Sequence, residues 1–293
     1  MELEDHIRTE GSKSSNARTL LTVWLFFGTS AALSWTVWLL PVQQGRVIYL
    51  TFLQWRMEWP LILVVGNCLP GILALVWALF LGKHQLGRIL HSLLAWRTPL
   101  RWYVLSIILP LGVFLISSSI VVVYFPSKRG WPPVSPLFEG LLTLPFGPLW
   151  EEIAWRAFAL RRLQSRYSRL TSSLIVGVYW AVWHIPLWYL TLGYVTVTLL
   201  LIMCINLIAW SVIFASLYNR SMESLPVVIL LHAVYMAAQN EAFAAVSYSN
   251  IHLIPVSAVL SLCLAIVVTR CDKRQKTHED MSLLVRRHGE SDR

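Results

Sequence analysis

The sequence has few charged residues for its length. Only 13% of its 293 residues are Asp, Glu, Lys or Arg, whereas 56% are hydrophobic. An ordinary soluble domain carries about a quarter charged residues. The shortage therefore excludes an ordinary soluble enzyme and indicates a protein embedded in a lipid bilayer.

Cysteine is scarce as well. The four cysteines lie in or at the ends of apolar runs, and none forms a CxxC pair or another metal-ligand spacing: Cys68, Cys204, Cys263 and Cys271. The sequence therefore indicates neither a disulfide framework nor a cysteine metal site.

Long apolar runs make up most of the chain. A helix needs about 20 apolar residues to cross about 30 Å of hydrocarbon. Eight runs are long enough: 20–40, 60–82, 102–125, 136–160, 171–190, 195–218, 225–246 and 252–270. We therefore predict an all-α fold, a polytopic membrane bundle of about eight transmembrane helices.

The chain has a net charge of +9, and its positive residues are concentrated in particular segments between the apolar runs. Lys and Arg gather before the first run, between the second and third, between the fourth and fifth, and after the last. The positive-inside rule then places both termini in the cytoplasm, which requires an even number of spans. We expect this charge to face the membrane and not nucleic acid. The expected location is the cell membrane of a prokaryote or the endoplasmic reticulum membrane of a eukaryote.

Composition divides the chain into five parts. Residues 1–19 are polar and predict a mobile arm with at most a short surface helix. Residues 20–130 predict scaffold helices, and residues 131–246 predict a core that carries the polar residues. Residues 247–270 predict the last span, and residues 271–293 a charged cytoplasmic tail.

Five ionisable residues of the core lie inside apolar sequence. Glu151, Glu152 and Arg156 belong to the fourth run, His184 to the fifth and His232 to the seventh. Such groups are costly at membrane depth and are kept where they pair, face a wet cavity or do chemistry. At about 1.5 Å of helix rise per residue, all three runs bring them to the cytoplasmic half of the membrane. We therefore predict one shared, wet pocket.

The spacing within the fourth run gives the two carboxylates different roles. Glu152 and Arg156 are i and i+4 with the acid first, which favours an ion pair, whereas Glu151 points about 100° away. A carboxylate without a counter-charge in an apolar site binds a proton more readily, which suits a general base. We infer that Glu151 activates water. His184 would hold this water directly or through a metal, and His232 would donate to the oxyanion during hydrolysis of an amide.

Other interpretations of these residues stay open. The ion pair could lock two helices, or the charged groups could line the path of a small transporter, and a lone intramembrane histidine can be a packing residue. The absence of a visible inverted repeat weighs against the transporter.

The motifs resemble those of a known family, the CAAX prenyl protease and bacteriocin-processing (CPBP, also called Abi) intramembrane proteases. The family pattern is Glu-Glu-x-x-x-Arg, then Phe-x-x-x-His, then His-x-x-x-Asn. The first motif is complete at residues 151–156, and the second runs from Trp180 to His184 with tryptophan in place of phenylalanine. The third begins at His232 but has Met236 in place of asparagine. The resemblance covers about residues 135–245.

This resemblance implies a helical bundle with a conical cavity open to the cytoplasm, and a peptidase that acts on a peptide or a lipidated protein. The substrate is a prenylated C-terminal tail in eukaryotic relatives and a secreted peptide in many bacterial ones. Members are commonly called metalloproteases, so a divalent metal such as zinc, held by Glu151, His184 and His232, is a candidate cofactor. The implied catalytic residues are Glu151, Glu152, His184 and His232, with Arg156, Trp180 and Met236 in support.

Met236 is the main departure from the family pattern. A thioether cannot donate a hydrogen bond, so it cannot replace an amide at an oxyanion site. Losing one such donor costs about a hundredfold to a thousandfold in rate. Either another amide, Asn206 or Asn240, takes its place, or the protein cleaves slowly. The alternative function is a catalytically impaired relative that acts as a binding, immunity or assembly factor.

Overall fold

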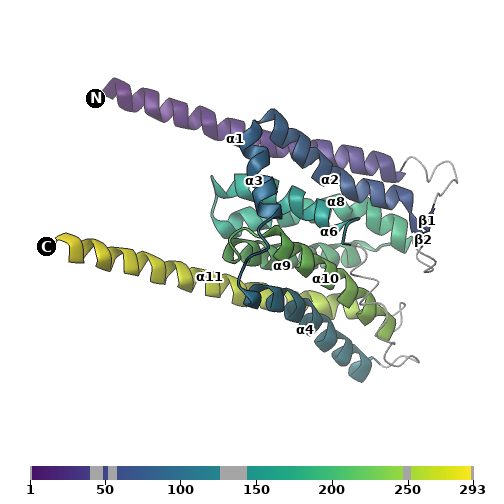
Figure 1. The fold of residues 1–293 in the computed structure, drawn as a ribbon. Coiled ribbons are helices and arrows are strands. Elements are labelled where there is room, and N and C mark those ends of the chain that lie inside the picture. The colour runs from purple at the N-terminus through teal and green to yellow at the C-terminus, as the bar shows by residue number, and fades with distance from the viewer. Residues whose placement is uncertain (1, 40–48, 52–57, 126–143, 247–251, 292–293) are drawn as a thin grey trace.

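The computed structural model describes residues 2–39, 49–51, 58–125, 144–246 and 252–291, which are almost entirely helical. Figure 1 shows long helices packed side by side, with α1 and α11 extending beyond the bundle on the same side. In chain order the helices are α1 (Glu2–Leu39), α2 (Leu61–Phe80), α3 (Lys83–Leu93), α4 (Leu100–Tyr124), α6 (Pro148–Glu152), the π-helix η2 (Ile153–Leu160), α7 (Arg161–Gln164), α8 (Arg169–Leu192), α9 (Val197–Arg220), α10 (Leu225–Val246) and α11 (Leu253–Ser291). The predicted polytopic helical bundle is confirmed.

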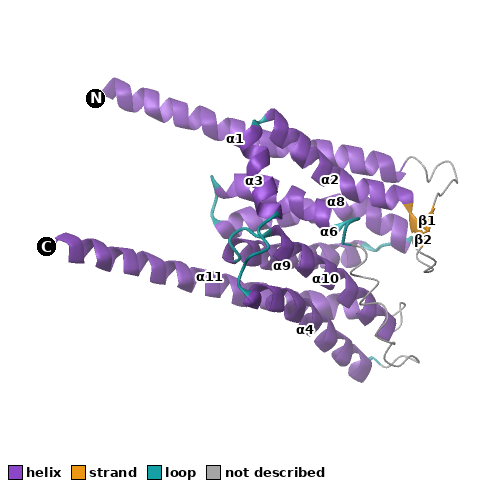
Figure 2. Cartoon of the chain, in the orientation of Figure 1, coloured by secondary structure: helices purple, strands orange, loops and turns teal. Residues whose placement is uncertain are grey.

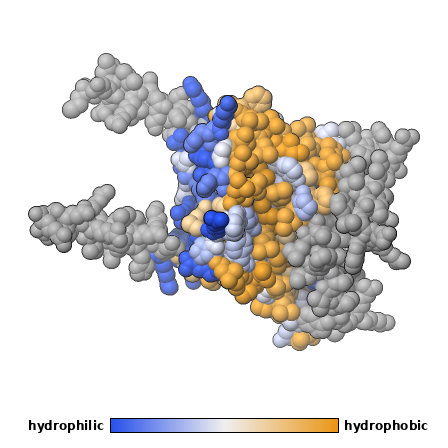
Figure 3. Space-filling view, in the orientation of Figure 1, coloured by the Kyte–Doolittle hydropathy of each residue, from blue (hydrophilic) through white to orange (hydrophobic). Residues whose placement is uncertain are grey.

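Six of the predicted spans are long and apolar enough to cross a membrane in the described part of the chain. They are Ala17–Leu39, Ile62–Phe80, Leu100–Tyr124, Arg169–Leu192, Val197–Arg220 and Leu253–Arg274. A broad hydrophobic band crosses the face of the bundle shown in Figure 3, and hydrophilic residues gather there at the side from which α1 and α11 extend (Figure 1). The chain is a multi-pass integral membrane protein.

The other two predicted spans are less regular. The fourth run, 136–160, lies partly outside the described residues. Its described part, 144–160, is a turn followed by α6 and η2, and α7 continues the helical segment to Gln164. The seventh run is α10, which carries Gln239, Asn240 and Glu241 near its end. Both segments pack inside the bundle, where most of their side chains are buried, so they need less apolar surface than a helix that faces lipid.

The structure also contains elements that we did not predict. A short antiparallel ribbon joins β1 (Tyr49–Thr51) to β2 (Glu58–Pro60) (Figure 2). The helices α1 and α11 continue through residues that composition predicts to be a mobile arm and a charged tail. No proline interrupts residues 2–39 or 256–291, so nothing in these stretches ends the helix. The predicted boundaries at residues 130 and 247 lie outside the described residues.

Helix α3 is a further unpredicted element, and it crosses the long helices at their hydrophilic side (Figure 1). Arg88 of α3 and Arg162 of α7 both donate to Gln85 Oε1, which ties the two helices together. Burial, together with the nearby charges of Arg88 and Arg161, lowers the pKa of Arg162 to about 10. Arg162 therefore stays charged at neutral pH, and α3 contributes to the positive side of the bundle.

Helix α2 approaches α6 at backbone contact distance. A β-carbon added at Gly71 would lie 2.5 Å from the carbonyl oxygen of Trp150, the residue before the carboxylate pair. One turn earlier, Cys68 Sγ contacts the carbonyl oxygen of Phe146 at 3.5 Å. These contacts fix where the fourth span begins its helix.

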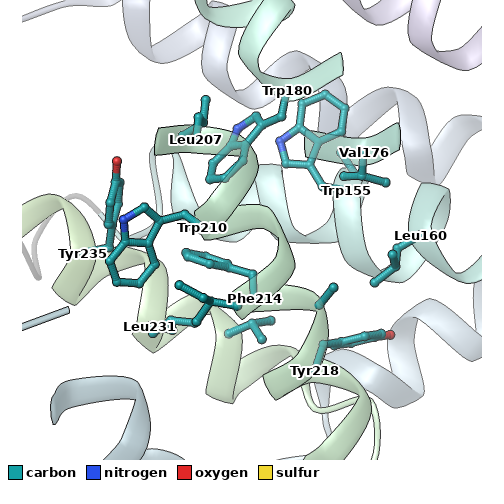
Figure 4. Close-up of a cluster of buried hydrophobic side chains, with 14 of the residues drawn as sticks. Trp155, Leu160, Val176, Trp180, Leu207, Trp210, Phe214, Tyr218, Leu231 and Tyr235 are labelled. Carbon is teal, nitrogen blue, oxygen red and sulfur yellow. The ribbon is translucent and has the colours of Figure 1, made fainter. Parts of the chain in front are cut away.

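An aromatic core surrounds the inner end of that span. Figure 4 shows Trp155 of η2, Trp180 of α8, Trp210 and Phe214 of α9 and Tyr235 of α10 gathered in the centre of the bundle. The rings of Trp180 and Phe214 are 5.7 Å apart, and those of Trp210 and Tyr235 are 4.8 Å apart. Bulky, close-packed rings of this kind leave the neighbouring polar groups little freedom to move.

The approach of α2 to α6 predicts a stability effect. The substitution Gly71→Ala should destabilise the protein by about 1–3 kcal/mol, because the backbone of α6 cannot yield as a flexible side chain can. Gly112→Ala in α4 is the matched control, since no atom lies within 4 Å of the added carbon. It should leave stability equal or raise it by up to about 1 kcal/mol. Unfolding in detergent measures both, and a Gly71→Ala protein as stable as wild type would contradict the packing.

Candidate active site

Glu151 is a buried carboxylate with one oxygen fixed and the other free. Its Oε2 accepts hydrogen bonds from Trp180 Nε1 at 2.7 Å and from Trp155 Nε1 at 3.4 Å. Among the described residues, none donates to Oε1, and the side chain keeps 4% of its surface exposed. Two indole donors therefore hold the carboxylate in one orientation while Oε1 stays available to a small molecule.

Glu152 lies at the centre of a buried charge cluster. Its Oε1 receives Arg156 Nη1 at 3.2 Å and His232 Nδ1 at 2.8 Å, and its Oε2 is 3.2 Å from Arg156 Nε. The ion pair predicted from the i, i+4 spacing is thus present, with both side chains fully buried. The guanidinium also stacks on Trp180 and Phe214, at 4.8 and 4.6 Å from their ring centres. Glu152 is therefore neutralised by a partner that Glu151 lacks.

Each histidine uses its Nδ1 to hold its ring in place. His184 Nδ1 lies 2.9 Å from the carbonyl oxygen of Trp180, which can only accept, so this nitrogen carries the proton. The Nε2 of neutral His184 is then a lone-pair acceptor. His232 Nδ1 is engaged by Glu152, which leaves its Nε2 on the opposite edge of the ring. Both rings keep one nitrogen free for chemistry.

Trp180 is the residue around which the three groups gather. Besides its bond to Glu151, its ring lies 5.7 Å from the ring of His184 and 5.4 Å from that of His232. His184 also interacts electrostatically with both Glu151 and His232. The structure thus brings residues from α6, α8 and α10 to a single indole. The family's phenylalanine at this position would have no N–H to donate.

The local sequence explains how the carboxylates are presented. Pro148 occupies the first helical turn, where its missing N–H costs nothing, and Glu151 N donates to the Gly147 carbonyl oxygen. The chain then changes to the π-helix η2 directly after Glu152. The wider turns of π-helices are rare and occur mostly at functional sites. In η2, Trp155 and Arg156 both reach back to the carboxylate pair.

The third-motif residue and the two amides predicted as its substitutes lie in different surroundings. Met236 is partly buried and packs against the hydrophobic core. Asn206 is buried on α9, and its Oδ1 accepts no hydrogen bond from the described residues, whereas Asn240 is exposed two turns beyond His232. A fourth residue, Asn67 of α2, borders the same position at Gly147 as Glu151 Oε1 does, and the sequence did not predict it as a site residue. In the sequence, the only feature that indicates a role for Asn67 is that it places an amide inside an apolar span.

The metal-ligand set does not assemble in the described part of the chain. No group of three or more His, Cys, Asp or Glu side chains lies close enough together there to hold an ion. The indole donors on Glu151 Oε2 also favour hydrogen bonding over ligation at that oxygen. A divalent metal held by Glu151, His184 and His232 therefore stays a prediction from the resemblance.

Comparison with known proteins defines the class of this core. Residues 133–238 match the Rce1-like family, described as type II CAAX prenyl endopeptidase Rce1-like. A 54-residue segment is 44% identical to CAAX prenyl protease 2 of Methanococcus maripaludis, which is 18% of this chain and 18% of that protein. These matches support, for the core of the chain, the family predicted from the three motifs, that of the CAAX prenyl protease and bacteriocin-processing proteins.

The bond between Trp180 and Glu151 predicts an effect on stability. Trp180→Phe removes a 2.7 Å hydrogen bond to a buried carboxylate and should cost about 1.5–3 kcal/mol. Trp24→Phe, at a side chain that is 54% exposed, is the control and should be close to neutral. Unfolding in detergent compares the two, and equal stability would show that the indole does not hold Glu151.

Proposed function

We propose that this protein is an intramembrane endopeptidase in which Glu151 activates water for hydrolysis of a peptide bond. The observation that carries the proposal is the difference between the two carboxylates. Glu152 is neutralised by Arg156 and bonded to His232, whereas Glu151 is oriented by neutral indoles and keeps Oε1 free. The family match of the core supports the same reaction class.

The reaction begins with a water molecule bound to Glu151 Oε1. His184 Nε2 accepts the second proton of this water as a hydrogen bond and so orients it. The water oxygen forms a bond to the scissile carbonyl carbon as its proton passes to Glu151. The π electron pair of the carbonyl moves to its oxygen, and the resulting oxyanion is stabilised by hydrogen-bond donors. His232 fills this role as an imidazolium, whose Nδ1–H donates to Glu152 and whose Nε2–H donates to the oxyanion.

Collapse of the tetrahedral intermediate completes the hydrolysis. The oxyanion re-forms the carbonyl bond, the carbon–nitrogen bond breaks, and the leaving nitrogen takes the proton from Glu151. The products are a carboxylic acid and an amine, and Glu151 returns to its starting state. Glu152 takes no part in these transfers, because its role is to orient His232 through the 2.8 Å bond.

The surroundings of the site favour a membrane-associated substrate. Glu151 and His232 are 4% and 3% exposed, inside a bundle that carries a broad hydrophobic band on the face shown in Figure 3. A peptide that is lipidated, or that is itself inserted in the membrane, is already concentrated at that depth. We therefore propose a prenylated C-terminal tail as the first substrate class to test, with a membrane peptide as the second.

One observation favours a second function. Met236 replaces the donor of the third motif, which would slow catalysis about a hundredfold to a thousandfold if no other donor takes its place. Such a protein could still bind a lipidated or membrane peptide as an immunity or assembly factor. Binding without turnover is the result that would favour this alternative.

The direct test uses purified protein in liposomes with a farnesylated CAAX peptide and its unprenylated counterpart. Glu151→Gln should lower cleavage by about a hundredfold to ten-thousandfold, because it removes the base while keeping the shape of the side chain. Glu241→Gln on α10 is the control and should cleave at the wild-type rate. Mass spectrometry of the released C-terminal residues measures both, and wild-type cleavage by Glu151→Gln would contradict the proposal.

A further inference from the structure

Asn67 places an amide beside the general base from a helix outside the family-matched region. Its helix α2 touches the backbone of α6 at Gly71, one turn further along. Residues i and i+4 lie on the same helix face, so Asn67 faces α6 as Gly71 does. The Asn67 amide therefore lies at the start of the fourth span, next to Gly147 and Glu151.

A small open position separates Asn67 from the free oxygen of Glu151. The point that a β-carbon of Gly147 would occupy lies 3.6 Å from Glu151 Oε1 and 3.9 Å from Asn67 Nδ2. Apart from the chain neighbours Phe146 and Pro148, no other side chain of the described residues comes within 4 Å of that point. The absent side chain of Gly147 thus leaves a space bordered by a carboxylate oxygen and an amide nitrogen.

The bonding of Asn67 is incomplete. Its Oδ1 is buried and accepts no hydrogen bond from the residues that the structure describes, and none of them accepts from its Nδ2. A buried amide oxygen without a hydrogen-bond partner is destabilising. Polar groups of this kind in folded proteins are commonly satisfied by a bound molecule. A molecule bound in the space at Gly147 would lie between Asn67 Nδ2 and Glu151 Oε1.

We propose that Asn67 is a catalytic residue whose Nδ2 donates a hydrogen bond to the oxyanion. The inference rests on the proposed hydrolysis. A water molecule about 2.8 Å from Glu151 Oε1 attacks the carbonyl carbon, and the carbonyl oxygen lies about 2.9 Å from Asn67 Nδ2 on the other side of the gap. As the π pair moves to this oxygen, the amide stabilises the new charge without transferring a proton, and the bond weakens when the intermediate collapses.

A donor at Asn67 would replace the asparagine that is missing from the third motif at Met236. Met236 cannot donate a hydrogen bond, and Asn240 is exposed two turns from His232. Neither Asn206 nor Asn240 comes within 4 Å of the position at Gly147 that Asn67 and Glu151 border. Asn67 is the amide that the described part of the chain places beside Glu151. The donor that the family places on α10 would then come from α2 in this protein.

The test compares kcat and KM for four proteins in liposomes with the cleaved peptide. Asn67→Leu keeps the volume of the side chain but removes the donor, and it should lower kcat about a hundredfold to a thousandfold with KM little changed. Asn240→Ala, which removes an exposed amide, should match wild type. Glu151→Gln reports on the hydrolysis itself.

A second variant separates an oxyanion donor from a packing residue. Met236→Asn restores the family's amide on α10, so in the Asn67→Leu background it should raise kcat about tenfold or more. In the wild-type background the same change should have a much smaller effect, because a donor is already present. Loss of kcat with unchanged unfolding in detergent, and its recovery by Met236→Asn, together support the proposal.

The outcomes distinguish the two proposals. If Glu151→Gln is inactive while Asn67→Leu cleaves at the wild-type rate, the role of Asn67 is overturned and the hydrolysis stands. If Asn67→Leu loses stability and Met236→Asn restores no activity, Asn67 is a packing residue and the proposal is again overturned. If wild type does not cleave, or Glu151→Gln cleaves equally well, both proposals fail together.

Discussion

The buried pairing of Glu152 with Arg156 is the interaction on which the rest of the site depends. Both side chains are fully buried, and the same carboxylate holds His232. An isolated charge at this depth would be very costly, so the three groups are stable only together. Because Glu152 pairs with Arg156 and His232, the adjacent Glu151 accepts hydrogen bonds only from neutral indole N–H groups and keeps Oε1 free. One ion pair thus gives two neighbouring carboxylates separate roles.

The parts of the structure that follow from local sequence were predictable. Apolar runs of about 20 residues identified the membrane helices, and the i, i+4 spacing identified the Glu152–Arg156 pair. The helix α3 was missed because an amphipathic segment of 11 residues resembles a charged loop in composition. The full lengths of α1 and α11 were missed because polar composition indicates solvent exposure without excluding a helix.

The finer contacts of the site could not be predicted because they join distant parts of the chain. Trp180 was noted as a replacement for phenylalanine, but its bond to Glu151 depends on how α8 packs against α6. Asn67 was overlooked because its position depends on the close approach of α2 at Gly71. The motifs therefore identified which side chains carry the chemistry. The packing of α2 and α8 determined which atoms of those side chains remain free.

The most direct test of this account is the stability of the ion pair in a double-mutant cycle. Arg156→Ala should destabilise the protein by about 3–5 kcal/mol, because it leaves Glu152 buried without its partner. Adding Glu152→Ala should recover part of that loss, so the two effects should be far from additive. Unfolding in detergent of the single and double variants gives the coupling energy. Additive effects, or an Arg156→Ala protein as stable as wild type, would contradict the claim that this pair organises the site.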